Sequence, residues 1–202
     1  MKTPHWQEVL EFWFGDPPPH TEASVRARLP LWFGKRAADD VQIHERFGTL
    51  YDLACSGGCE AWTASAQGAL ALIVVRDQFA RVLHRGCAKA FSSDVSNLVT
   101  ARSAVAAGFD RTLSAVERVF LYMPYMHSES SAVQDESVTL YAALSSEAPA
   151  AIKPFLAEVL SYAERHREIV TRFGRFPHRN ETLGRTTSDD EHSFLQQPHS
   201  AF

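Results

Sequence analysis

The sequence has few lysines, few cysteines and no long apolar run. Only four of its 20 basic residues are lysine, so most of its cationic groups are guanidinium forks, which suit carboxylate and phosphate. Three cysteines are too few for a disulfide framework and favour a reducing compartment. The longest apolar run, Ala69 to Val75, is too short to cross a bilayer, and the N-terminus shows no signal-peptide pattern. We therefore expect a cytoplasmic protein with no membrane partner.

Signatures of several common functions are also missing. There is no glycine-rich phosphate loop, no Gly-x-Ser-x-Gly motif and no basic helix interleaved with aromatic residues. A net charge of -4 argues against a general nucleic-acid binder. Cys55 and Cys59 lack a second Cys or His pair, so they do not form a recognised zinc site. We expect no nucleic-acid partner, no cofactor and no metal, and the sequence leaves the oligomeric state open.

Apolar residues recur at helical spacing along most of the chain, and no β-hairpin signal occurs. No linker divides the 202 residues, so we predict one all-α domain over residues 1–202, with seven to eight helices in a bundle or solenoid-like stack. Thr3-Pro4 is expected to start the first helix, and Leu31-Trp32-Phe33 to anchor a loop. The helices are expected at about residues 3–15, 39–57, 63–83, 94–108, 114–124, 131–144, 150–173 and 188–195.

Two polar segments follow strongly apolar helices. Asp77 and Arg81 are four residues apart with the acid first, the favourable order for an ion pair on one helix face. The simpler interpretation is an internal pair that fixes helix register, because buried charges persist when they are paired. His127 and Glu129 follow Pro124, which is expected to disrupt its helix and free carbonyl groups that His127 would satisfy.

A histidine occurs on the buried side of the long helix predicted for residues 150–173. His166 is three residues from Ala163, on the apolar face. It is either a hydrogen-bonded core residue or a functional group, and with His127 and Glu129 it would complete a set of mixed metal ligands. The spacing matches no established metal motif.

The segment from Arg172 to Arg185 holds more donors than a helix cap needs. It is either a C-terminal strap whose arginines pair with internal acids and helix carbonyls, or an anion-binding wall. If the polar segments converge, four arginines face Asp77 and Glu129, which leaves about two positive charges for a ligand. The anion-binding interpretation takes as catalytic residues His127, His178 and Glu129. Its ligand-binding residues are Asp77, Arg81, His166, Arg175, Arg179, Asn180 and Arg185.

With these residues in place, the chain resembles a bacterial family classified as domain of unknown function 924. The resemblance implies an all-α array similar to tetratricopeptide repeats and no established activity. Ala80 and Val82 stand where the family pattern has proline and asparagine, which removes one polar side chain from the candidate site. The resemblance is carried by Phe12-Trp13-Phe14-Gly15, Asp77-Gln78-Phe79-x-Arg81, Phe91-x-x-Asp94, Phe120-Leu121-Tyr122-Met123-Pro124, His127-Ser128-Glu129, His166, Arg172 to Asn180 and Leu183-Gly184-Arg185.

Three hypotheses about function follow. The first is a pocket for a small anionic ligand, a carboxylate or a phosphate, in which histidine acts as acid or base. The second is a tetratricopeptide-like interaction module that binds an acidic peptide or a partner protein. In the third, the polar residues only satisfy one another, and any partner surface lies elsewhere.

Overall fold

The computed structural model describes residues 5–34, 36–198 and 200, and the regular structure of this part of the chain is entirely helical. The α-helices are α1 (Trp6–Phe14), α2 (Glu22–Phe33), α3 (Ala37–Cys55), α4 (Ala66–Ile73), α5 (Ala80–Leu83), α6 (Asp94–Ala106), α7 (Ala115–Met126), α8 (Ser131–Ser146), α9 (Lys153–Phe173) and α10 (Asp189–Leu195). A π-helical turn, η2 (Val74–Phe79), joins α4 to α5. Short 3-10 turns are η1 (Glu60–Ala64), η3 (Ala88–Phe91), η4 (Phe109–Thr112), η5 (Ala150–Ile152) and η6 (Pro177–Arg179).

The described residues form nine helices when α4, η2 and α5 are counted as the continuous helix they make, so the predicted seven to eight is too low. The additional helix is α2, where we expected a loop. Its pattern gives no clear apolar face, and Pro30 lies inside it. Thr21 and Ser24 nevertheless cap its start reciprocally, each side chain accepting the other's backbone N–H. Burial of Trp32 fixes its far end in the core.

The other predicted helix starts agree closely with the structure. Ser114 and Ser188 open α7 and α10 through the capping boxes that the sequence indicates. The predicted start of the first helix at Thr3-Pro4 lies outside the described residues. Asp94 is the first residue of α6 rather than its cap, which is Ser93.

The prediction that Pro124 ends its helix is wrong. α7 continues to Met126, and the carbonyl groups near its end are satisfied by a neighbouring helix. Gln134 of α8 donates to the carbonyls of Met126 and Ser128, each at 2.7 Å. His127 is therefore not needed to satisfy these groups and turns elsewhere.

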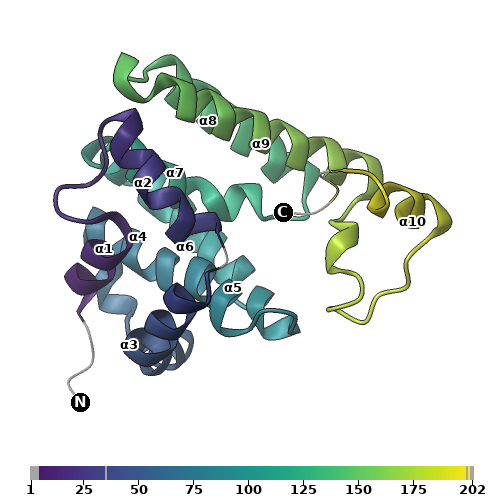
Figure 1. Ribbon diagram of the computed structural model, residues 1–202, viewed down its shortest axis with the longest axis horizontal. Coiled ribbons are helices and arrows are strands. Elements are labelled where there is room, and N and C mark those ends of the chain that lie inside the picture. The colour runs from purple at the N-terminus through teal and green to yellow at the C-terminus, as the bar shows by residue number, and fades with distance from the viewer. Residues whose placement is uncertain (1–4, 35, 199, 201–202) are drawn as a thin grey trace.

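The continuous helix formed by α4, η2 and α5 lies at the centre of the molecule (Figure 1). It contacts α1, α3, α6 and α7. The long helices α8 and α9 pack side by side, and α7 packs against α8 on the side of the core. None of the described helices combines the length and apolar character that crossing a membrane requires.

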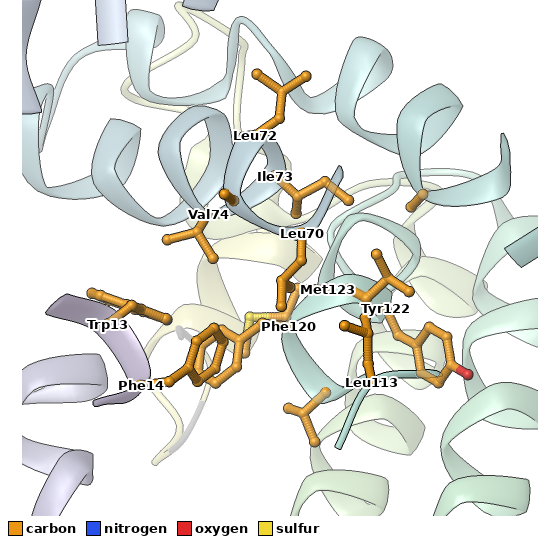
Figure 2. Packing of buried hydrophobic residues seen from close by; sticks show 14 of the residues in the cluster. Trp13, Phe14, Leu70, Leu72, Ile73, Val74, Leu113, Phe120, Tyr122 and Met123 are labelled. Carbon is orange, nitrogen blue, oxygen red and sulfur yellow. The ribbon is translucent and has the colours of Figure 1, made fainter. Parts of the chain in front are cut away.

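Aromatic side chains lock the first helices onto this core (Figure 2). The rings of Trp13, Phe14 and Trp32 pack edge-on against Phe120 of α7, with centroids 4.9 to 5.7 Å apart. Trp32 Nε1 also donates to the carbonyl of Trp13 at 2.9 Å.

The main apolar cluster ends near Ala163 of α9. Residues beyond it bury only a small separate cluster around Ile169, Val170 and Phe176. The segment after α9, residues 174–188, is called here the C-terminal strap. With so little apolar burial, its position depends on polar contacts.

Two helical glycines, Gly68 in the first turn of α4 and Gly48 inside α3, give a test of the packing. A Cβ on Gly68 would meet the Trp62 carbonyl oxygen and crowd Ser65 Oγ, whereas a Cβ on Gly48 meets nothing within 4 Å. We expect Gly68→Ala to lower the free energy of unfolding by about 1–3 kcal/mol and Gly48→Ala to raise it by about 0.4–1 kcal/mol. Urea denaturation at neutral pH measures both. Equal effects of the two substitutions would contradict the close approach at Gly68.

Candidate functional site

The candidate site begins in the π-helical turn η2, at the middle of the central helix. All six of its residues are buried, including the charged side chains of Arg76 and Asp77. Arg76 turns toward α3, where its Nε donates to the Ala54 carbonyl at 3.1 Å, and it also pairs with Glu60. Asp77 turns toward α7 instead. Single π-helical turns occur often at functional sites, because they redirect side chains from the regular helical faces.

Asp77 is fully buried and satisfied by three side chains. Its Oδ1 lies 2.8 Å from His127 Nδ1 and 3.2 Å from an Arg81 guanidinium nitrogen, and Gln78 donates to its Oδ2. Burial alone would raise the pKa of Asp77, but Arg81 and His127 outweigh it and hold that pKa below the ordinary 3.8. An ionised carboxylate only accepts, so the Nδ1 of His127 carries the proton in this bond. The predicted Asp77–Arg81 ion pair is therefore present, and His127 joins it.

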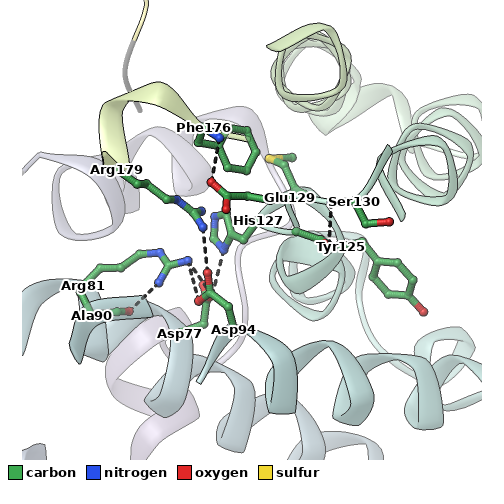
Figure 3. A network of polar contacts seen from close by, with 12 residues as sticks. Asp77, Arg81, Ala90, Asp94, Tyr125, His127, Glu129, Ser130, Phe176 and Arg179 are labelled. Atoms are coloured by element: carbon green, nitrogen blue, oxygen red, sulfur yellow. Dashed lines mark hydrogen bonds and ion pairs between the residues drawn. The ribbon is translucent and has the colours of Figure 1, made fainter. Parts of the chain in front are cut away.

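A second carboxylate, Asp94 of α6, is shared by two arginines (Figure 3). Its Oδ1 pairs with Arg81 and its Oδ2 with Arg179, each at 3.1 Å. Arg81 also donates to the Ala90 carbonyl at 2.9 Å. The guanidinium carbons of Arg81 and Arg179 lie 5.4 and 4.7 Å from the centroid of the Phe91 ring. The short segment from η3 to the start of α6 thus supplies both the Phe91 ring and the Asp94 carboxylate that contact these two arginines.

Arg179 is only 6% exposed and sits between the Phe91 and Phe176 rings. Burial lowers the pKa of Arg179, a shift that Asp94 opposes and the nearby Arg81 reinforces. Among the described residues, Arg179 Nε has no hydrogen-bond partner. A buried guanidinium donor without an acceptor is uncommon in folded proteins.

Two histidines, His166 and His178, contact the Phe176 ring, and His127 lies beside the first of them. The ring of His166 lies 6.4 Å from that of His127 and 5.4 Å from Phe176, and His178 lies 5.7 Å from Phe176 on centroid distances. Burial lowers the pKa of His166 to about 3 and that of His178 to about 4. The Nδ1 of His166 donates to the Tyr162 carbonyl at 2.7 Å. At neutral pH His166 is therefore an uncharged ring with its proton on Nδ1.

Glu129 fastens the C-terminal strap to the end of α7. Its Oε1 accepts from the Phe176 N–H at 2.7 Å, and Arg185 donates to both of its oxygens at 2.7 and 3.0 Å. Arg185 also bonds Asn180 Oδ1 at 3.0 Å. Burial works against the charge of Glu129, but Arg185 and the Phe176 N–H outweigh it and lower its pKa. With both oxygens engaged, Glu129 acts as an anchor in this arrangement.

A fourth acid, Glu191 of α10, closes the strap. Arg175 donates to its two oxygens at 2.7 and 2.8 Å, and Asn180 lies 3.3 Å from Oε2. The bond from Arg175 lowers the pKa of Glu191 to about 2. Arg175 therefore serves the strap and α10, and it is not part of the group around Asp77.

The family model of bacterial proteins of unknown function, DUF924, matches residues 9–199. The chain belongs to the DUF924 family. A solved structure of a protein of unknown function from Agrobacterium tumefaciens is similar, with 33% sequence identity and a TM-score of 0.78, covering 95% of this chain and 96% of that chain. A search of curated proteins finds no significant match. The resemblance noted from the sequence is thus confirmed, and it brings no activity with it.

In this DUF924 protein the predicted site residues divide into two groups. Those beside the Asp77 carboxylate or the Phe176 ring are Asp77, Arg81, His127, His166, His178 and Arg179. Those that hold the strap are Glu129, Arg175, Asn180 and Arg185. No three His, Cys, Asp or Glu side chains in the described part of the chain are grouped so that they could hold a metal ion.

The expected surplus of about two positive charges is wrong. That prediction balances four arginines against Asp77 and Glu129 alone, but Asp94 and Glu191 also face these arginines. Local sequence patterns account for both acids as residues in the first turn of a helix and do not indicate their arginine partners. The motif Phe91-x-x-Asp94 was the signal for the first, because its ring and its acid contact the same two guanidinium groups. For Glu191 the sequence contains no comparable motif, because its place in the capping box with Ser188 accounts for an acid at this position.

The buried neutral state of His166 predicts a pH dependence. The folded pKa lies near 3 and the unfolded value is 6.5, so below pH 6.5 the unfolded chain binds the extra proton and stability falls with falling pH. We expect a loss on the order of 2 kcal/mol between pH 6.5 and 5, reduced in His166→Gln. Urea denaturation at several pH values measures it. If the free energy of unfolding falls equally with pH in His166→Gln and in the exposed control His192→Gln, the pH dependence comes from groups other than His166.

The shared acid Asp94 gives a second test. Asp94→Asn removes the charge that faces the buried Arg179, and we expect it to cost about 3 kcal/mol. Glu136→Gln, which breaks the exposed Arg102–Glu136 pair, should cost less than about 1 kcal/mol. Denaturation at pH 7 compares these acid-to-amide changes. Similar costs would mean that Asp94 is not required to neutralise the arginines.

Proposed function

We propose that the protein binds a small carboxylate- or phosphate-bearing molecule beside the Asp77–His127 pair, and that His127 acts on it as a general acid and base. The observation that carries this proposal is the bond between the buried Asp77 carboxylate and His127 Nδ1 at 2.8 Å. A carboxylate on one ring nitrogen orients the imidazole and leaves its other nitrogen, Nε2, for proton transfer. The side chain of His127 is 15% exposed, so the ring reaches solvent.

The arginines beside this pair give the site its preference for an anion. Arg81 and Arg179 approach the same carboxylate, Asp94, from two sides. An oxyanion from a ligand would bond the unused Arg179 Nε and compete with Asp94 for the other donors. The cluster is neutral without a ligand. A ligand anion therefore binds by replacing the Asp94 carboxylate at some of the arginine donors.

The remaining predicted catalytic residues have different roles in this proposal. Glu129 positions the strap through Arg185 and the Phe176 N–H, so its expected part in proton transfer is replaced by an anchoring part. His178 contacts the same Phe176 ring as His166, and we keep it as a second acid or base. His166 stays neutral at physiological pH, and its ring lies 6.4 Å from that of His127.

The alternative is a tetratricopeptide-like module that binds an acidic peptide. It requires guanidinium groups along an open concave face. Arg175, Arg179 and Arg185 instead each engage an acid of the chain itself, so the geometry favours the small ligand. We also propose a cytoplasmic location, which the free thiols of Cys55, Cys59 and Cys87 support.

Anion binding is tested by titrating ¹⁵N-labelled protein with inorganic phosphate and acetate at constant ionic strength. We expect saturable shifts of the His127 ring nitrogens and of Arg179 Nε. Arg81→Gln should weaken binding about tenfold, since one guanidinium contact to an anion is lost. The control Arg118→Gln alters a half-buried arginine that pairs with Glu147 away from the cluster, and should leave binding unchanged. Shifts that do not saturate, or that are equal in both variants, would leave the cluster with a structural role.

Proton transfer is tested on a panel of phosphate monoesters and carboxylic esters followed by NMR. We expect turnover of at least one compound, reduced about 10²–10⁴-fold in His127→Gln. The control His192→Gln alters a surface histidine of α10. Turnover that survives the loss of His127 would place the chemistry on another residue.

A further inference from the structure

A cationic cavity lies between α1, α2 and α3. These helices are at the end of the molecule away from α10 (Figure 1). The cavity has a volume of about 440 Å³, within the range of small-molecule sites. It is lined by none of the residues of the Asp77 cluster or the strap. Three arginines line it, Arg28, Arg36 and Arg46, together with apolar surface from Phe12 and Leu31.

Two of these arginines are held in place without an acid. The guanidinium carbon of Arg46 lies 4.9 Å from the Phe12 centroid and 5.0 Å from the Phe47 centroid. This contact holds the cation over aromatic rings, and no hydrogen bond from the Arg46 guanidinium group to another described residue is formed. Arg28 donates from one terminal nitrogen to the Phe12 carbonyl at 3.1 Å, near the C-terminal end of α1. In the described part of the chain, neither arginine forms an ion pair.

The acids of the cavity leave a small positive excess. Arg36 and the buried Asp39 form a two-bond pair at 2.6 and 3.0 Å, which is neutral as a unit. Glu11 also lines the cavity, and no described residue forms an ion pair with it. Arg28 and Arg46 therefore face Glu11 alone, an excess of one positive charge. That balance suits a singly charged group better than a dianion.

We propose that this cavity binds a small organic carboxylate. The carboxylate accepts hydrogen bonds from Arg28 and Arg46, whose flat donor groups match its two oxygens. The apolar body of the ligand packs against Phe12 and Leu31, both half-buried in the cavity wall. Glu11 repels a second negative charge, so inorganic phosphate is a poorer ligand than a carboxylate with a hydrocarbon tail.

The test follows the side-chain Nε–Hε signals of Arg28 and Arg46 in the ¹⁵N-labelled full chain. Hexanoate is the probe, hexanol is its neutral match, and inorganic phosphate is the competing anion. We expect saturable shifts of both arginines with hexanoate, none with hexanol, and binding of phosphate at least about tenfold weaker. Arg46→Gln should weaken hexanoate binding about tenfold. The control Arg26→Gln, on the exposed side of α2 and paired with Glu22, should leave it unchanged.

The proposal is overturned by phosphate binding as tight as hexanoate, by equal shifts with hexanol, or by unchanged affinity in Arg46→Gln. It is equally overturned if hexanoate shows no saturation at tens of millimolar. Glu11→Gln provides a variant that keeps both arginines, at an exposed position of α1. Glu11→Gln should strengthen hexanoate binding and reduce the ratio of hexanoate affinity to phosphate affinity severalfold. Weaker hexanoate binding, or a larger ratio, would also overturn the proposal.

Discussion

Everything near the candidate site depends on one constraint, a fully buried carboxylate in the central helix. Asp77 has no access to solvent, so its charge must be balanced by neighbours that reach it within the core. Arg81 reaches it from the next turn of the helix, and His127 reaches it from the end of α7. The π-helical turn directs the acid toward α7. The packing of α7 on the central helix therefore fixes both the core and the orientation of the His127 ring.

The second level of organisation is the C-terminal strap, which reaches this cluster with little apolar burial of its own. Arg179 engages Asp94, which lies 85 residues earlier in the chain, and Glu129 engages Arg185 and the backbone of Phe176. Replacing such pairs by apolar residues is often neutral for stability, so their main effect here is to fix one position of the strap. That position places Phe176 against the rings of His166 and His178.

Local sequence signals were sufficient to predict most helices, but they did not predict which helices and side chains contact one another. Capping boxes at Ser114 and Ser188 located two helix starts, because the capping bonds span only three residues. α2 was missed because its apolar residues follow no helical face and its stability comes from Trp32 packing on α1 and α7. The convergence of Asp77, Arg81, His127 and Arg179 was an assumption that spacing alone cannot support, since three of the contacts join separate helices or turns. Asp94 was assigned to a helix start, yet its partners come from η6 and the central helix.

The Asp77 cluster and the cavity between α1, α2 and α3 differ in how their guanidinium groups are held. In the cluster, every arginine rests against a carboxylate of the chain, so a ligand anion gains only the difference between its contacts and those of Asp94. In the cavity between α1, α2 and α3, Arg46 rests on two aromatic faces and Arg28 on a carbonyl group. A ligand there displaces no internal acid. The cavity is therefore suited to binding a ligand tightly. The cluster would bind an anion more weakly, and its chemical feature is the oriented ring of His127.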